Sequence, residues 1–159
     1  MDKQLISTLQ TEFNKLSNTL ENSNIEYWFA RDLQKILGYN SWDKFQNVIT
    51  KAKIAVVTSG GIVPQGNPDR IESSSATKYG VYSIDDMDTM LPEDFMTIHG
   101  GYDRAFVLKN PNLVVPLDVL RDMEKKGEIG ELADYFISTT GTGTSTGNAK
   151  AFGESFTKL

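Results

Sequence analysis

The chain contains no cysteine among its 159 residues, and its only histidine is His99. Disulfides and cysteine-ligated zinc are therefore excluded, and a single histidine cannot form a histidine-rich metal site. No apolar run in the sequence approaches the roughly 20 residues that a membrane-spanning helix needs, and no signal region opens it. These absences predict a cytoplasmic protein that carries no cofactor.

Basic charge is also scarce, because 16 Lys and Arg stand against 21 Asp and Glu, for a formal net charge of −5. Residues 1–53 carry seven basic and six acidic side chains, whereas residues 54–159 carry nine and fifteen. Non-specific DNA binding relies on clustered Lys and Arg that neutralise phosphates, so we expect weak or no DNA binding. The acidity is compatible with a basic protein partner, such as the nucleic-acid-binding channel of another protein, and it is also usual for a soluble bacterial protein.

Three helices are expected in the first 52 residues. An apolar stripe with helical spacing predicts the first over 2–20, and it consists of Leu5, Ile6, Leu9, Phe13, Leu16 and Leu20. After a strand-like segment at 27–29, a second helix over 30–37 ends at Gly38, and Ser41 caps a third. Two interpretations of the short helices stay open: a helix-turn-helix that exposes Lys44 and Asn47 to DNA, or a compact unit with a solvated polar face.

The remaining chain mixes strand and helix signals. Residues 54–58 form an apolar run typical of a buried parallel strand, residues 62–80 are rich in turn residues, and residues 92–94 suit the first turn of a short helix. Pro116 begins a helix, a shorter helical stretch with Ile129, Leu132, Tyr135 and Phe136 follows, and a last helix is expected over 148–158, with Asn148 as its N-cap. The class predicted is a mixed α/β fold.

Candidate ligand groups lie in the loops. The backbone of Ser59, Gly60 and Gly61 can cradle an anion after the strand, or simply form a tight turn. In the loop over 139–147, Thr142 and Thr144 can bind an oxyanion ahead of the last helix.

Two further charged candidates carry alternatives. Arg70 can reach a ligand carboxylate or pair with Glu72 on the surface. His99 and Asp103, in the motif HGGYD, can form a general acid/base pair, or His99 can be a structural residue that bonds a loop carbonyl.

Two family resemblances meet at Lys51–Lys53. Residues 26–52, EYWFARDLQKILGYNSWDKFQNVITKA, resemble DNA-damage-inducible protein D and its BRO-N relatives. The sequence from Lys51, including HGGYD, VPLDVLRDMEKKGEIGELADYF and GTGTSTGNAKAFGESF, resembles the selenoprotein B component of glycine, sarcosine, betaine and D-proline reductases. The chain is therefore expected to be a chimera, with a helical segment over 1–52 and a partial parallel-sheet unit over 53–159, either as two domains or as one cooperative unit.

The second resemblance implies both a site and an absence. It places the two Gly-containing turns together at one end of the sheet, which would form a pocket. In that family a strand and then a selenocysteine or cysteine motif follow the matching region, but this chain ends at Leu159 and has no cysteine. The chain is expected to lack catalysis. The missing strand would leave residues 54–58 to be covered by the first helix or by a second copy, or the fold would rearrange.

Three functions follow from these expectations. The main one is a non-catalytic acidic inhibitor or antitoxin-type factor of a phage or defence system, such as an anti-CRISPR, that acts by occluding another protein. A join at a shared tripeptide also suits an engineered or computationally generated (de novo) chain. Its partner-binding candidates are Leu9, Phe13, Leu16, Lys44 and Asn47. The alternatives are a ligand-binding fragment of a glycine or betaine reductase substrate subunit, and a DNA-binding accessory protein.

Overall fold

The computed structural model describes residues 3–19 and 26–159. Its Cα atoms group into two compact units, Met1–Thr50 and Lys51–Leu159. Helices and strands occur together, with parallel and antiparallel pairing, which confirms the predicted mixed α/β class. The division into two domains stays a prediction, because compactness does not show that a unit folds by itself. None of the described helices is long and apolar enough to cross a membrane.

The first unit is mainly helical. Its described elements are α1 (Lys3–Leu16), β1 (Asn18–Thr19), β2 (Glu26–Tyr27), α2 (Ala30–Ile36) and α3 (Trp42–Ile49). The first helix ends at Leu16, earlier than predicted, because β1 pairs with β2 in antiparallel fashion instead of continuing the helix. The strand-like segment is shorter than predicted, since Phe29 is already the N-cap of α2. Asp2 and Leu20 lie outside the described residues.

The glycine that ends α2 and the serine that caps α3 take the roles predicted for them. Gly38 follows α2 with a left-handed φ of +78°, as a C′ glycine does. The Ser41 hydroxyl accepts the Lys44 N–H at 3.4 Å and caps α3. Within α3, Phe45 is buried while Val48 is 44% exposed.

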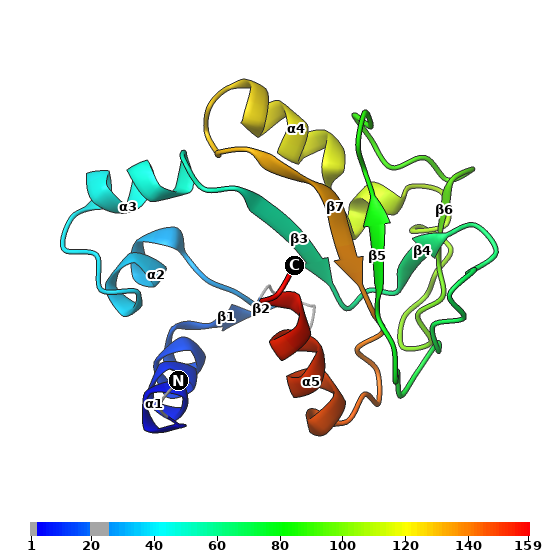
Figure 1. Ribbon diagram of the computed structural model, residues 1–159, viewed down its shortest axis with the longest axis horizontal. Coiled ribbons are helices and arrows are strands. Elements are labelled where there is room, and N and C mark those ends of the chain that lie inside the picture. The colour runs from blue at the N-terminus through cyan, green and yellow to red at the C-terminus, as the bar shows by residue number, and fades with distance from the viewer. Residues whose placement is uncertain (1–2, 20–25) are drawn as a thin grey trace. The chain divides into compact units, whose positions relative to one another are not determined.

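The second unit is built on a three-stranded sheet. Its order is β3 (Ile54–Thr58), β7 (Leu132–Ser138), β5 (Gly80–Ser83), and Figure 1 shows β7 between the other two. β3 runs parallel to β7 and β5 runs antiparallel to it. β3 is therefore a sheet edge. The prediction of a buried strand is wrong, because alternate residues of β3, including Val57 at 52%, are exposed and so lie on one uncovered face.

The centre of the sheet was predicted incorrectly. Residues 129–136 were expected to be helical, but β7 occupies most of that stretch and continues to Ser138. The spacing of Leu132, Tyr135 and Phe136 imitates a helical face. Burial of Phe136 and Ile137, which are consecutive, marks a strand covered on both faces instead.

Two shorter segments also differ from the expectation. Residues 62–64, in the predicted loop, form β4 (Ile62–Pro64), which pairs antiparallel with β6 (Phe95–Thr97). The predicted helix at 92–94 is a turn that leads directly into β6. Here the buried side chains of Ile62 and Phe95 decide the outcome, because both join the main hydrophobic core.

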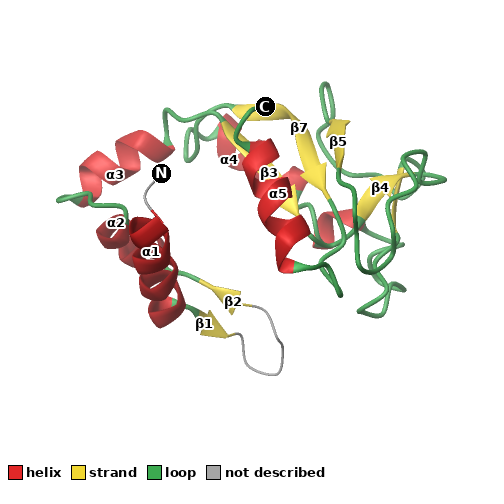
Figure 2. Ribbon diagram, turned by 60° about the horizontal axis from the view of Figure 1, so that its bottom comes forward, coloured by secondary structure: helices red, strands yellow, loops and turns green. Residues whose placement is uncertain are grey.

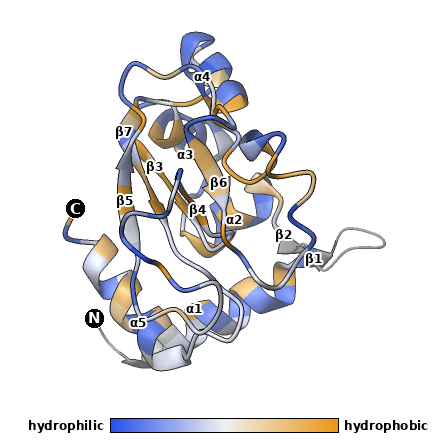
Figure 3. Ribbon diagram, turned by 90° about the vertical axis from the view of Figure 1, so that its right-hand side faces the viewer, coloured by the Kyte–Doolittle hydropathy of each residue, from blue (hydrophilic) through white to orange (hydrophobic). Residues whose placement is uncertain are grey.

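Both α-helices of this unit lie in the C-terminal half of its sequence. Pro116 is the N-cap of α4 (Leu117–Lys125), as predicted, and η1 (Pro111–Leu113) precedes it. Figure 3 shows α4 alternating between hydrophilic and hydrophobic residues, as a helix with one buried face does. Figure 2 shows α5 (Thr146–Phe156) beside β3 and β7. Its N-cap is Ser145 rather than the predicted Asn148, whose amide donates to the Ala76 carbonyl at 3.0 Å.

Candidate functional site

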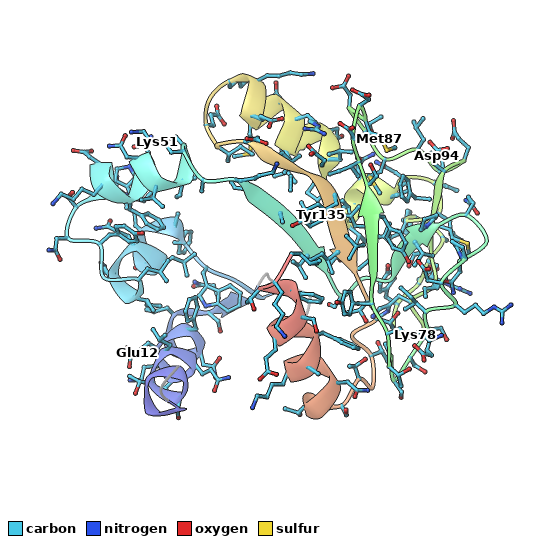
Figure 4. All side chains as sticks on the ribbon, in the orientation of Figure 1. Glu12, Lys51, Lys78, Met87, Asp94 and Tyr135 are labelled. Atoms are coloured by element: carbon cyan, nitrogen blue, oxygen red, sulfur yellow. The ribbon has the colours of Figure 1, made fainter. Side chains whose placement is uncertain are left out.

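Two loops lie together where β3 and β7 end. These strands are parallel and finish at the same end of the sheet, near Lys78, which Figure 4 labels. The Gly141 N–H donates to the Ser59 carbonyl, and the Gly61 N–H donates to the Thr139 carbonyl, each at 2.9 Å. The two Gly-containing turns therefore meet in the structure.

A third loop, which follows β6, closes on the first. The Ile98 N–H donates to the Gly61 carbonyl at 2.9 Å. The hydroxyls of Thr97 and Tyr102 both donate to the Gly60 carbonyl, at 3.1 and 2.7 Å, and lie 2.8 Å from each other. Thr97 is fully buried. These bonds fix the loop that carries the single histidine.

His99 uses both of its ring nitrogens. Its Nδ1 accepts the Gly101 N–H at 3.0 Å, and its Nε2 lies 3.1 Å from the Thr142 hydroxyl. The ring stacks on Tyr102, with centroids 4.5 Å apart and an interplanar angle of 18°. Burial lowers the pKa of His99 below its ordinary value of 6.5. The imidazole is thus held in place and favoured in its neutral form.

Two glycines leave the space that this arrangement needs. Gly61 has a φ of +67°, and a Cβ there would lie 3.0 Å from the His99 main-chain nitrogen and 3.2 Å from the Thr140 hydroxyl. A Cβ on Gly101 would overlap the Thr142 hydroxyl and lie 2.8 Å from the His99 ring. A side chain at Gly61 would crowd the backbone of the loop at His99, and one at Gly101 would force the Thr142 side chain to move.

In the loop after β7, the two predicted ligand residues Thr142 and Thr144 differ in whether a ligand can reach them. The Thr144 hydroxyl donates to the Thr140 carbonyl at 2.5 Å and accepts the Ala76 N–H at 3.0 Å. The Ser75 N–H donates to the Thr142 carbonyl at 2.7 Å. Thr144 is therefore occupied inside the loop, whereas Thr142 has an exposed side chain that a ligand can reach.

A cavity of about 240 Å³ opens beside these loops. Its lining is mainly apolar and includes Val57, Ser59, Thr140, Thr144, Phe152 and Phe156. The Thr140 hydroxyl is buried and has no hydrogen-bond partner among the described residues. Drug-sized ligands occupy pockets of roughly 300–1,000 Å³, so this cavity suits a smaller molecule.

A wider depression of about 360 Å³ lies at the other end of the sheet, beside Met87, which Figure 4 labels. Its central cation, Arg121, donates to the carbonyls of Ile84 and Met87 at 3.0 Å each and to Glu124 at 3.0 Å. These bonds hold α4 against the turn after β5. Within residues 3–19 and 26–159, no group of three or more His, Cys, Asp or Glu is placed to hold a metal ion.

The charged candidates are not brought to His99. Asp103 accepts a main-chain N–H two residues ahead at 3.0 Å, and no bond between Asp103 and His99 is present in the described part of the chain. The proposed acid/base pair is therefore not formed. Glu72 accepts from the Thr77 hydroxyl and N–H rather than pairing with Arg70, which is exposed with a φ of +51°.

The five partner-binding candidates all lie in the first unit. Leu9, Phe13 and Leu16 are partly buried, and Lys44 and Asn47 are exposed. The Phe13 ring packs edge-on against Trp28, whose Nε1 donates to the Phe13 carbonyl at 2.7 Å. The apolar stripe thus has a partner within its own unit, and its role in binding another molecule stays a prediction.

Comparison with known proteins decides the family. The profile of glycine/sarcosine/betaine reductase selenoprotein B matches residues 42–159. The chain belongs to this selenoprotein B family. No solved structure matches it.

Three relatives of this selenoprotein B family member are subunits of reductase complexes from Peptoclostridium acidaminophilum. Sarcosine reductase complex component B subunit beta is 73% identical over 110 residues, which is 69% of this chain. Glycine reductase complex component B subunit gamma is 59% identical over the same length, and betaine reductase complex component B subunit beta is 50% identical over 101 residues. The chain spans about a quarter of the length of these relatives, 25%, 25% and 23%.

Membership of the selenoprotein B family corrects several expectations. The prediction of an inhibitor or antitoxin-type factor, such as an anti-CRISPR, is wrong, because the relatives are reductase complex subunits. The same matches contradict a de novo chain and give no support to a partner with a nucleic-acid channel. The predicted chimera is also unsupported, since the family match begins at residue 42, inside the segment assigned to the other family.

Sequence reasoning missed three residues of the loop cluster. Thr97, Tyr102 and Thr140 were not among the candidates, although Tyr102 belongs to the HGGYD motif. Thr97 and Thr140 carry no local signal, because their importance comes from contacts with residues more than 35 positions away or from complete burial.

Proposed function

We propose that this chain supplies the ligand-binding loops of a component B subunit in an amino-acid reductase complex, and that these loops bind the carboxylate of a small amino acid such as sarcosine. The observation that best supports this proposal is that the loops 59–61, 97–103 and 139–145 lie together at the carboxyl ends of β3 and β7. Ligands of open α/β sheets bind at this position. The loops also lie inside the region that matches the family.

The chemistry of the loops supports a small ligand with an oxygen acceptor. The cluster includes the exposed Thr142 hydroxyl, and the neighbouring cavity of about 240 Å³ is small and lined mainly by apolar atoms. The Ser59 hydroxyl would approach the ligand from one side, and Thr142 from the other. The N–H groups of Gly60 and Gly61, predicted to cradle an anion, instead donate to the Thr58 hydroxyl at 3.0 Å and to the Thr139 carbonyl at 2.9 Å. Relatives named for sarcosine, glycine and betaine share a carboxylate-bearing ligand class with this proposal.

The relatives are components of complexes, which supports a protein partner for this chain as well. We expect that partner to be another subunit of a reductase. The DNA-binding alternative has no comparable support, since the net charge is −5 and the matches are reductase subunits.

Nuclear magnetic resonance titration of the ¹⁵N-labelled chain with sarcosine, glycine and betaine tests the proposal. Saturable shifts should appear in residues 59–61, 97–103 and 139–145. Thr157→Val, which changes an exposed threonine at the end of α5, is the control and should bind as the unmodified chain does. Shifts confined to the charged depression around Arg121, or no saturable shifts at millimolar ligand, would contradict it.

A further inference from the structure

The hydrogen bonds around His99 have a fixed direction. A main-chain N–H can only donate, so the Gly101 N–H requires a lone pair on Nδ1. A neutral imidazole with a lone pair on Nδ1 carries its proton on Nε2. The Nε2–H therefore donates to the Thr142 hydroxyl oxygen, 3.1 Å away. The imidazolium form does not fit, because it would place two N–H groups of Gly101 and His99 against each other.

This direction leaves the Thr142 hydroxyl with a hydrogen to donate. Its oxygen accepts from His99, and no acceptor for its own hydrogen is present within the described residues. The main chain of Thr142 is anchored, because its carbonyl accepts the Ser75 N–H at 2.7 Å and the Thr144 N–H closes the turn onto the Gly141 carbonyl at 3.1 Å. The hydroxyl is thus an exposed donor on a fixed backbone.

The main chain next to this hydroxyl also presents hydrogen-bond donors. The N–H groups of Thr142 and Gly143 also have no hydrogen-bond acceptor in the part of the chain that the structure describes. Gly143 has a φ of +68°, and a Cβ there would lie 2.9 Å from the Ser75 hydroxyl, so this turn requires glycine. Three donors therefore belong to two consecutive residues, and none of them has an acceptor oxygen in residues 3–19 or 26–159.

From this arrangement we infer that His99 and Thr142 form a one-directional donor pair that recognises a carboxylate oxygen of the ligand, with Thr142 in contact and His99 as the positioning residue. The inference rests on the proposed function and assigns roles within the same loops. It replaces the idea that His99 transfers a proton, because both ring nitrogens are already committed. A hydroxyl that accepts a bond from Nε2–H becomes a better donor, since neighbouring hydrogen bonds polarise each other.

Paired variants separate the donor role from a merely structural one. His99→Gln keeps a donor at the position of Nε2, whereas His99→Asn keeps an acceptor at the position of Nδ1 and loses the donor to Thr142. Thr142→Ser keeps the hydroxyl, and Thr142→Val removes it at nearly constant volume. We expect sarcosine affinity to fall about tenfold in His99→Asn and Thr142→Val, as for one lost charge-assisted hydrogen bond. It should stay within about threefold in His99→Gln and Thr142→Ser.

Two further readouts complete the test. Long-range ¹H–¹⁵N spectra of the unmodified chain should show the Nε2–H tautomer of His99, and the Nδ1–H tautomer would overturn the inference. Titration with acetate, which has no amine, and with dimethylamine, which has no carboxylate, identifies the recognised group. Acetate binding without sarcosine binding would contradict the proposed function while supporting the donor pair. Equal affinity in Thr142→Val and Thr142→Ser, or no binding of either carboxylate, would overturn the donor pair.

Discussion

Gly101 shows how the absence of a side chain can position a functional one. A Cβ at this residue would overlap the Thr142 hydroxyl, so Gly101→Ala forces Thr142 into another rotamer and breaks its bond with His99. We expect the free energy of unfolding to fall by about 1–2 kcal/mol, which corresponds to one lost hydrogen bond and local strain. Urea denaturation followed by circular dichroism measures this change.

Gly153→Ala is the matched control. Gly153 lies within α5, and a Cβ there would meet no atom within 4 Å. Alanine should therefore stabilise the protein by about 0.5–1 kcal/mol, because glycine costs conformational entropy inside a helix. Changes in unfolding free energy of opposite sign in Gly101→Ala and Gly153→Ala would show that the contact made by the new Cβ decides the effect, rather than the loss of glycine itself. A loss in both variants would contradict the assignment of Gly101.

Prediction from sequence works at the residue scale where the cause is local. The left-handed glycine at 38 and the cap at Ser41 follow from backbone geometry within a few residues. Asn148 was expected to cap α5, but Ser145 takes that role because the Asn148 amide is engaged by the Ala76 carbonyl, 72 positions away. Such distant partners leave no mark in the nearby sequence.

The same limit applies to whole elements. β7 was read as a helix because its apolar residues have helical spacing, and only its place between β3 and β5 makes it a strand. β3 was identified correctly as a parallel strand, because the run between Lys53 and Ser59 is mainly apolar, although its predicted burial was wrong. The candidate site could be located approximately, because the loops that follow β3 and precede α5 are rich in glycine and threonine.

Attachment of α4 to β7 gives a prediction at the element scale. Glu124 accepts the Leu132 N–H at 2.6 Å and the Arg121 guanidinium at 3.0 Å, and so joins the helix to the first residue of the strand. Glu124→Gln should lower the free energy of unfolding by about 1–3 kcal/mol, as for hydrogen bonds to a charged group. Glu154→Gln, in an exposed pair with Lys150 at 3.8 Å, should change it by less than about 0.5 kcal/mol.

The loss of unfolding free energy in Glu124→Gln should depend on pH in a definite direction. The Leu132 N–H, and then Arg121, hold the pKa of Glu124 below its ordinary value of 4.5. A carboxylate with a lowered pKa in the folded state contributes stability that is present above 4.5 and is lost as pH falls through the folded pKa. The gap between the unmodified chain and Glu124→Gln should therefore narrow below pH 4.5. If the difference in unfolding free energy between the two proteins stays constant as the pH falls below 4.5, the charge of Glu124 does not contribute to stability.

At the scale of the whole molecule, composition limits what the chain can do alone. Thiol or selenol chemistry needs a soft nucleophile of low pKa, and the chain contains no cysteine. We expect the purified chain, supplied with the other reductase components, to form no acetyl phosphate from an amino acid. A full-length component B relative, assayed with the same other components, is the positive control. Acetyl phosphate formation with this chain in place of component B would contradict the expectation.

The two units should also respond separately to a change in the first. Phe13 packs on Trp28 within the first unit, while the second unit has its own buried cluster around Phe136. An aspartate at position 13 places a charge in a partly buried apolar contact. Phe13→Asp should therefore destabilise the first unit and leave the second intact. Gln10→Asp adds the same charge at an exposed position of α1 and should have little effect.

Tryptophan placement makes this separation measurable. Both tryptophans, Trp28 and Trp42, lie in the first unit, so their fluorescence follows that unit alone. The methyl resonances of Ile62 and Ile84, which are fully buried, follow the second. In Phe13→Asp the fluorescence transition should move to lower temperature while the methyl resonances melt unchanged. If both transitions move together, the two units fold as one cooperative unit, and the predicted separation is wrong.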